Sequence, residues 1–61
     1  MSFELTILDP YGLPIPTGLS FELIGDGRVL AKASVENEGR VAFDATTEGI
    51  GRLGVRLDQN N

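Results

Sequence analysis

Residues 19–43 read LSFELIGDGRVLAKASVENEGRVAF, and this stretch carries the clearest structural pattern in the chain. Apolar and polar side chains alternate in three segments, residues 19–23, 29–35 and 41–43. Turn-forming residues separate these segments, first Gly25-Asp26-Gly27 and then residues 36–39. Period-two alternation interrupted by Gly, Asp and Asn is typical of antiparallel strands with one buried face. The stretch therefore predicts a β-meander, with Asn37 and Gly39 accepting the left-handed geometry of the second turn.

The same alternation continues on both sides of the meander. Residues 2–8 predict a first strand that stops at Asp9-Pro10, because proline lacks an N–H and restricts the residue before it. Residues 9–12 then form a turn, and the prolines within residues 13–17 predict a stiff, extended crossover between two sheets. Residues 53–57 predict a last strand. No segment shows a helical period, so we expect almost no helix.

The inward side chains of all these strands fall at odd positions. They are Phe3, Leu5, Ile7, Leu19, Phe21, Leu23, Val29, Ala31, Ala33, Val35, Val41, Phe43, Ala45, Leu53, Val55 and Leu57. Five half-apolar strands present more hydrophobic surface than one flat sheet can cover. The pattern therefore predicts two packed sheets, an open barrel, or pairing with another chain. We expect one domain over residues 1–58 and a disordered tail at residues 59–61.

Composition limits the chemistry of this 61-residue chain. Cysteine, histidine and tryptophan are absent, which removes disulfides, thiolate chemistry and the commonest neutral-pH base and metal ligand. The formal charge is −4 and no basic stripe occurs, so we expect neither nucleic acid nor an anionic membrane as a partner. The N-terminus lacks the pattern of a signal peptide. We expect a cytoplasmic protein or part of an exported or phage-like assembly.

Motifs that would indicate an active site are weak. Residues 49–54 match G-x-G-x-x-G, but a strand pattern follows instead of the helix that a dinucleotide site needs. The loop carboxylates lack the register of a calcium loop, so we predict no metal site. A serine or tyrosine hydroxyl has no histidine to activate it, and no S-x-x-K spacing occurs. We therefore predict no catalytic residue, no cofactor and no enzymatic activity.

A candidate interface comes from apolar residues outside the inward row. Leu8, Ile24 and Leu30 fall on the opposite face, and Tyr11 lies in the predicted Asp-Pro-Tyr-Gly turn. Scattered exposed leucines are normal, so these residues have an ordinary structural explanation. The alternative is a second apolar patch used for self-association. We favour the patch because a chain of this size builds only a small core.

Residues 5–23, LTILDPYGLPIPTGLSFEL, together with Gly27 and residues 37–43, NEGRVAF, resemble a transthyretin-like or Cna-B-type domain. The resemblance implies an all-β fold, a small antiparallel β-sandwich of prealbumin or immunoglobulin-like type with five to seven short strands. Members of this family act as spacers in surface adhesins, as modules beside peptidases and as appended domains on spikes of secretion systems and phage tails.

The chain departs from the family pattern at several points. The gap from Pro14 to Gly18 is one residue longer, and Ile7 occupies the place of the lysine that forms an internal isopeptide bond, so no self-crosslink is expected. One or two strands of the family sandwich are missing, which implies completion by another chain. The resemblance thus implies a homo-oligomeric structural or interaction module. The alternative is a small accessory subunit that completes an enzyme or ligand-binding complex through Tyr11 and the proline segment.

Overall fold

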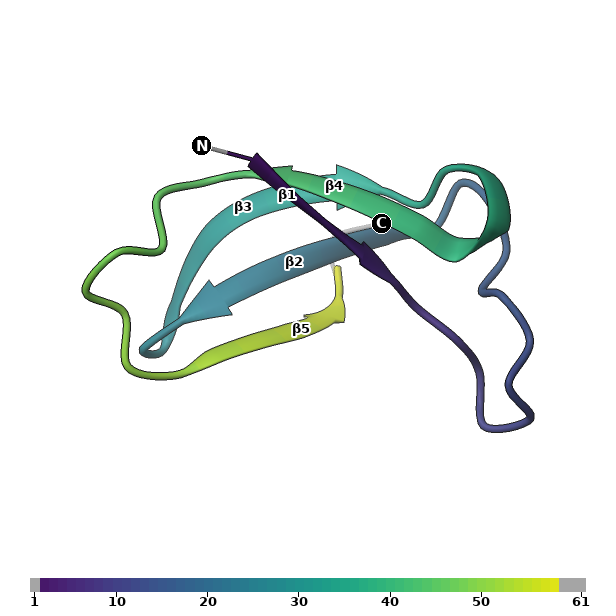
Figure 1. Ribbon diagram of the computed structural model, residues 1–61, viewed down its shortest axis with the longest axis horizontal. Helices are drawn as coiled ribbons and strands as arrows, with labels where there is room; N and C mark the ends of the chain where they lie inside the picture. The colour runs from purple at the N-terminus through teal and green to yellow at the C-terminus, as the bar shows by residue number, and fades with distance from the viewer. Residues whose placement is uncertain (1, 59–61) are drawn as a thin grey trace.

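The computed structural model describes residues 2–58, apart from the side chain of Phe3. It is an all-β fold with five antiparallel strands in two small sheets (Figure 1). The strands are β1 (Ser2–Thr6), β2 (Ser20–Gly25), β3 (Arg28–Ser34), β4 (Arg40–Asp44) and β5 (Leu53–Leu57). One turn of 3-10 helix spans Asn37–Gly39, and residues 2–58 contain no α-helix. The predicted all-β class is confirmed, whereas the predicted tail at residues 59–61 lies outside the described part.

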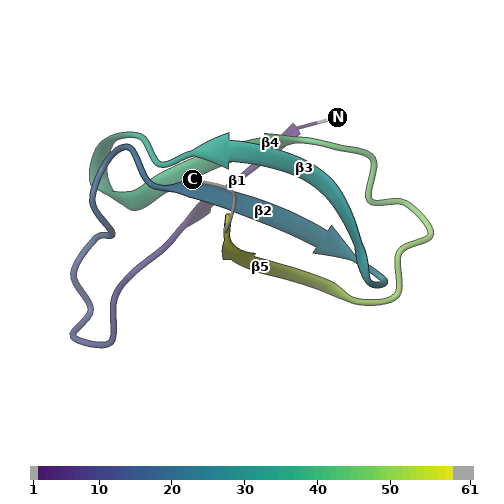
Figure 2. The same ribbon diagram turned by 180° about the vertical axis from the view of Figure 1, so that it is seen from behind.

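The two sheets contain different numbers of strands. In one sheet β1 pairs with β4, and Leu5 lies opposite Val41. In the other sheet β2 is central, and its Leu23 lies opposite Ala31 of β3 and Val55 of β5. Paired residues point to the same face of a sheet, so these three side chains share the inward face. Figures 1 and 2 show β5 at the outer edge of its sheet from both sides.

The hydrophobic core lies between the two sheets. Leu23, Val35, Val41 and Phe43 are buried. Leu23 lies in β2, Val35 follows directly after β3, and Val41 and Phe43 lie in β4, so the core joins the two sheets. All four residues occupy odd positions, as the alternation predicts. Half-buried side chains complete this core, namely Leu5, Ile7, Ile15, Phe21, Leu30, Ala31, Ala33, Ala45 and Val55.

A β-bulge in β3 reverses the predicted orientations of Val29 and Leu30. Leu23 pairs with Ala31, but the next residue, Ile24, pairs with Val29, which leaves Leu30 as an extra residue. An extra residue shifts the alternation by one place. Leu30 therefore packs against the core, whereas Val29 is 45% exposed. The predictions that Leu30 points away from the core and that Val29 points into it are wrong.

Three leucines of the predicted inward row remain in contact with solvent. Leu19, Leu53 and Leu57 are 37%, 46% and 49% exposed. Leu53 and Leu57 lie on β5, at the edge of a three-stranded sheet that faces a two-stranded one. The smaller sheet does not cover this edge. The orientation of these residues follows the alternation, but their predicted burial is wrong.

The β2–β3 turn has the geometry that its sequence predicts. Asp26 has φ 48° and Gly27 has φ 84°, and positive φ at both central residues is the requirement of a two-residue type I′ hairpin. The Asp26 carboxylate also accepts hydrogen bonds from the backbone N–H groups of Gly51 at 3.1 Å and Arg52 at 3.0 Å. One short side chain therefore fastens the start of β5 to this turn.

The turn before β4 is only partly as predicted. The left-handed residues are Glu38, with φ 59°, and Gly39, with φ 77°. The prediction that Asn37 takes this geometry is wrong. Gly39 is buried, and a Cβ atom there would lie 2.6 Å from the carbonyl oxygen of Ile7. The backbone of Ile7 also donates to the carbonyl oxygen of Gly39 at 2.8 Å, so a side chain at position 39 would separate these two segments.

Candidate functional site

The end of the molecule next to β1 carries a projecting hairpin, formed by residues 8–14 (Figure 1). Leu8 and Pro14 form an antiparallel bridge at its base. The Asp9 carboxylate accepts hydrogen bonds from the backbone N–H groups of Tyr11 and Leu13, both at 2.9 Å. The backbone of Asp9 adds a bond from its N–H to the Leu13 carbonyl oxygen at 2.7 Å. The hairpin is therefore held in shape by its own backbone and one aspartate.

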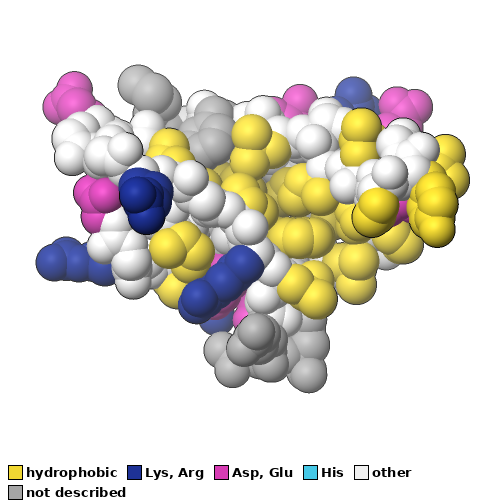
Figure 3. Space-filling view, turned by 90° about the horizontal axis from the view of Figure 1, so that it is seen from below, with side chains coloured by type: hydrophobic (Ala, Val, Ile, Leu, Met, Phe, Trp, Pro, Cys, Tyr) yellow, Lys and Arg dark blue, Asp and Glu magenta, His cyan; other side chains and the backbone are white. Residues whose placement is uncertain are grey.

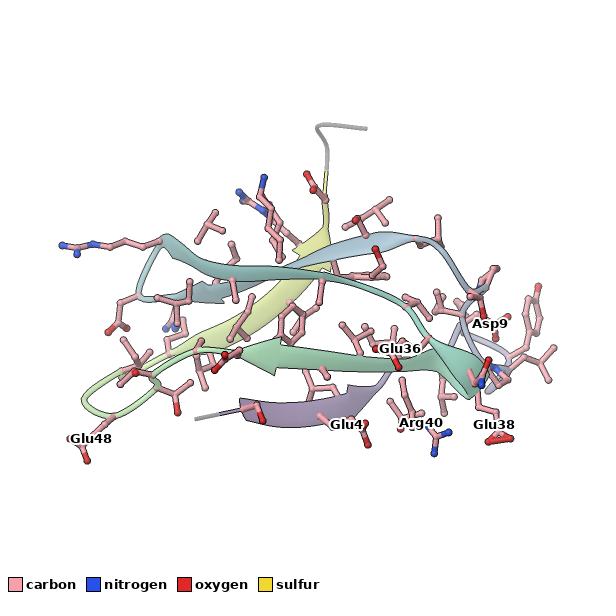
Figure 4. The ribbon with its side chains drawn as sticks, turned by 90° about the horizontal axis from the view of Figure 1, so that it is seen from above. Glu4, Asp9, Glu36, Glu38, Arg40 and Glu48 are labelled. Carbon is pink, nitrogen blue, oxygen red and sulfur yellow. The ribbon has the colours of Figure 1, made fainter. Side chains whose placement is uncertain are left out.

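This hairpin presents large hydrophobic side chains to solvent. Leu8 is 52% exposed, Leu13 is 61% exposed and Tyr11 at the tip is 89% exposed. Figure 3 shows hydrophobic side chains gathered at this end of the molecule, and Figure 4 places Asp9 there. An aromatic ring on a rigid turn loses little side-chain entropy on binding, which suits it to a protein contact.

The structure does not bring the four predicted interface residues together. Leu8 and Tyr11 lie on the projecting hairpin, whereas Ile24 pairs with Val29 and Gly54 in the three-stranded sheet. Ile24 is half-buried on the face opposite the core, as predicted, but Leu30 belongs to the core side. A single patch containing Leu8, Ile24 and Leu30 is therefore absent from the described residues.

Sequence reasoning also missed Ile15, which the crossover segment places against the core. Ile15 donates its backbone N–H to the carbonyl oxygen of Ile7 at 3.1 Å. One feature of the sequence could have indicated this burial: Ile15 is a large apolar residue between Pro14 and Pro16, and the rest of its segment is exposed. The crossover segment is thus anchored by the Ile15 side chain on the core and by its backbone hydrogen bond to Ile7, just after β1.

A second candidate surface is the open leucine row, which we define as Leu19, Leu53 and Leu57. These side chains lie at the edge of the inward face of the three-stranded sheet, around the ends of β5. Figure 3 looks onto the side of the molecule where β5 lies and shows hydrophobic side chains across its centre. Exposed hydrophobic side chains gathered on one side of a small protein commonly mark an interaction site.

The outer face of the same sheet carries a charged network around Glu22. Glu22 is only 5% exposed, and it lies opposite both Lys32 and Arg56 on the neighbouring strands. Its Oε1 accepts a hydrogen bond from Arg56 Nε at 2.8 Å, and its Oε2 lies 3.6 Å from Lys32 Nζ. Lys32 Nζ is also 3.8 Å from an Asp58 carboxylate oxygen. Each oxygen of the buried carboxylate has a cationic partner, so removal of either partner would leave part of a buried charge uncompensated.

The remaining carboxylates do not assemble a metal site in residues 2–58. Glu36 and Glu38 lie near the hairpin end, whereas Glu48 lies at the opposite end of the molecule (Figure 4). No cluster of three acidic side chains with metal-binding geometry occurs among the described residues, and this part of the chain encloses no pocket. Within the same residues no helix has the length and hydropathy needed to cross a bilayer.

Comparisons with protein-family models, with curated proteins and with solved structures find no match to this chain.

Proposed function

We propose that this chain is a non-enzymatic structural or protein–protein interaction module that self-associates as a spacer, adaptor or assembly unit. The observation that supports this proposal most is the open leucine row. Leu53 and Leu57 point to the core side of their sheet, yet both residues remain about half exposed. Apolar surface of this kind gains roughly 25 cal/mol for each Å² removed from water, so a second protein that covers it is stabilised by the contact.

The proposal includes the finer architecture that the sequence resemblance implies. In this view the two sheets are an incomplete transthyretin-like or Cna-B-type β-sandwich, and another chain completes it. The buried core between the sheets and the Asp9 turn support this view, because the family pattern places a D-x-x-G turn after the first strand. The unequal sheets, of two and three strands, are the feature that a partner would compensate.

Self-association is tested by light scattering and native mass spectrometry of the purified chain over a range of concentrations. We expect a symmetric oligomer, and we expect Leu57→Gln to weaken it. Val29→Gln is the matched control, because Val29 is exposed to a similar extent, 45% against 49%, but lies on the opposite face of the same sheet. A monomer at every concentration, or equal weakening by both variants, contradicts the proposal.

A second candidate function is that of an accessory subunit in a larger complex. Tyr11 favours it, because this side chain is 89% exposed on a turn that Asp9 holds rigid. In that case the protein purifies from its native source with a stoichiometric second polypeptide, and Tyr11→Ala loses that polypeptide. Purification as a symmetric particle of this chain alone argues against the subunit and for self-association.

A further inference from the structure

One row of backbone hydrogen-bonding groups on β5 has no partner among residues 2–58. Asp58 donates its N–H to the carbonyl oxygen of Ser20 at 2.8 Å, and the carbonyl oxygen of Arg52 accepts from Asp26 at 2.9 Å. Even-numbered residues of β5 therefore direct their backbone groups toward β2. Since these groups alternate along a strand, Leu53, Val55 and Leu57 direct theirs to the opposite side. No described strand lies on that side, because β5 ends the order β3-β2-β5.

We propose that two copies of this chain pair through the outer edges of β5, antiparallel, with the two-fold axis at Val55. This inference rests on the proposed function and names the surface that serves it. In this register Val55 faces Val55 of the second copy, and Leu53 faces Leu57. Leu53, Val55 and Leu57, whose backbone groups point outward, then form the hydrogen-bonded pairs between the two copies. Each of their outward N–H and C=O groups therefore has a partner.

The side chains fit the same register. On the inward face, Leu53 of one copy lies beside Leu57 of the other, so the two half-exposed leucines of each chain cover one another. On the outer face, Arg56 lies opposite Gly54, and Arg52 lies opposite Asp58, which keeps its own ion pair with Lys32. The directly opposed charges are of opposite sign, and Arg56, which lies diagonal to Arg56 of the second copy, is paired with Glu22 of its own chain.

The other strand edges are less suited to self-pairing. Just after β1, Ile7 donates its backbone N–H to Gly39, just before β4, so odd-numbered residues of β1 direct their backbone groups toward β4 and Glu4 directs its own outward. Pairing through this edge would place Glu4 against Glu4 of the second copy. In β3 the equivalent pairing would place Lys32 against Lys32. At the start of β4, the outward carbonyl oxygen of Arg40 already accepts from Glu36 at 2.7 Å. Among the described residues, β5 combines an edge that is unpaired along its whole length with a self-complementary sequence, whereas the edge of β4 is occupied at Arg40.

The expected product is a symmetric dimer in which the two three-stranded sheets form one continuous sheet. An interface built on short strands has an area at the low end of the range for specific complexes. We therefore expect a dimer that dissociates on dilution.

The first experiment removes one backbone donor by chemical synthesis of the full chain with an N-methyl group on Val55. This group points away from β2, so the intramolecular ladder and the valine side chain are kept. N-methylation of Glu4, on the free edge of β1, is the matched control. We expect the unmodified chain and the Glu4 analogue to dimerise, and the Val55 analogue to stay monomeric in sedimentation equilibrium.

The second experiment reads the unmodified chain directly by amide hydrogen exchange. The amides of Gly54 and Arg56 face β2 and are protected at all concentrations. The amides of Leu53, Val55 and Leu57 gain protection only as the concentration rises. This measurement tests whether the β5 edges pair even if the Val55 analogue does not fold.

A charge variant tests the register. Arg52→Glu places glutamate opposite Asp58 and should raise the dimer dissociation constant about tenfold, whereas Arg40→Glu makes the same charge change on β4 and leaves it unchanged.

A dimer that survives in the Val55 analogue, or amides of Leu53, Val55 and Leu57 that stay unprotected in the dimer, overturns the β5 pairing but leaves self-association standing. A monomer at all concentrations overturns the proposed function itself.

Discussion

Single residues of this small protein differ sharply in how much the fold depends on them, and the glycines show it best. Gly12 and Gly39 both have positive φ, at 84° and 77°. A Cβ atom at Gly12 would meet no atom within 4 Å, whereas at Gly39 it would meet the backbone of Ile7 and Ile15. Both positions favour glycine for conformation, but only Gly39 also requires it for space.

Replacing Gly39 should therefore cost far more than replacing Gly12. We expect Gly39→Ala to lower the free energy of unfolding by about 2–4 kcal/mol, from the left-handed backbone and the contact with Ile7. Gly12→Ala should cost about 1 kcal/mol, from the backbone conformation alone. Urea unfolding of the two variants checks this difference. Equal losses would show that the β1 segment can move away from position 39.

The bulge in β3 predicts different stability effects for substitutions at two adjacent residues. Leu30 packs against the core and Val29 is exposed, the reverse of what uninterrupted alternation predicts. We expect Leu30→Ala to lower the unfolding free energy by about 2 kcal/mol and Val29→Ala by about 0.5 kcal/mol or less. The two unfolding curves are compared under the same conditions. A larger loss for Val29→Ala would place the bulge elsewhere.

At the scale of the elements, one aspartate connects strands that are distant in sequence. Asp26 lies in the β2–β3 turn, and its carboxylate accepts from the backbone of Gly51 and Arg52 before β5 begins. The G-x-G-x-x-G match at residues 49–54 therefore has a structural explanation, because its central residues meet a carboxylate of the same chain.

Removal of the charge at this turn should loosen β5 before the other strands. We expect Asp26→Asn, which retains a residue tolerant of positive φ, to lower the unfolding free energy by about 1 kcal/mol. Hydrogen exchange should accelerate at Gly51 and Arg52 and stay unchanged in β1 and β4. Glu48→Gln, an exposed carboxylate in the preceding loop, is the control. Uniform acceleration across all strands would mean that the turn does not fasten β5 locally.

For the whole molecule, the balance between buried core and exposed apolar surface governs stability and association. Only four large hydrophobic side chains are fully buried among the described residues, whereas Leu8, Tyr11, Leu13, Leu19, Val29, Leu53 and Leu57 are exposed. A core of this size supplies little stability, and small domains commonly add it by oligomerisation.

If the folded chain associates and the unfolded chain does not, thermal stability must depend on protein concentration. We expect the midpoint of thermal unfolding to rise on the order of 5 °C when the concentration is raised about hundredfold. Differential scanning calorimetry over that range measures the shift. A midpoint independent of concentration would indicate that the monomer is the stable unit.

The sequence by itself determined the all-β class, the approximate strand segments and, outside the bulge of β3, the parity of the core, because side chains alternate with a period of two along a regular strand. It also located the Asp-Pro-Tyr-Gly and Gly-Asp-Gly turns, whose residues accept the required backbone geometry.

Only the tertiary structure decided which strands are neighbours, and through them the environment of individual residues. Alternation tells which side a residue faces but not what covers that side. Thus Leu53 and Leu57 face inward yet stay exposed, and Glu22 faces outward yet is buried between Lys32 and Arg56. Nor does alternation show a bulge, since one extra residue in β3 changes the faces of Val29 and Leu30 without changing the composition of the strand.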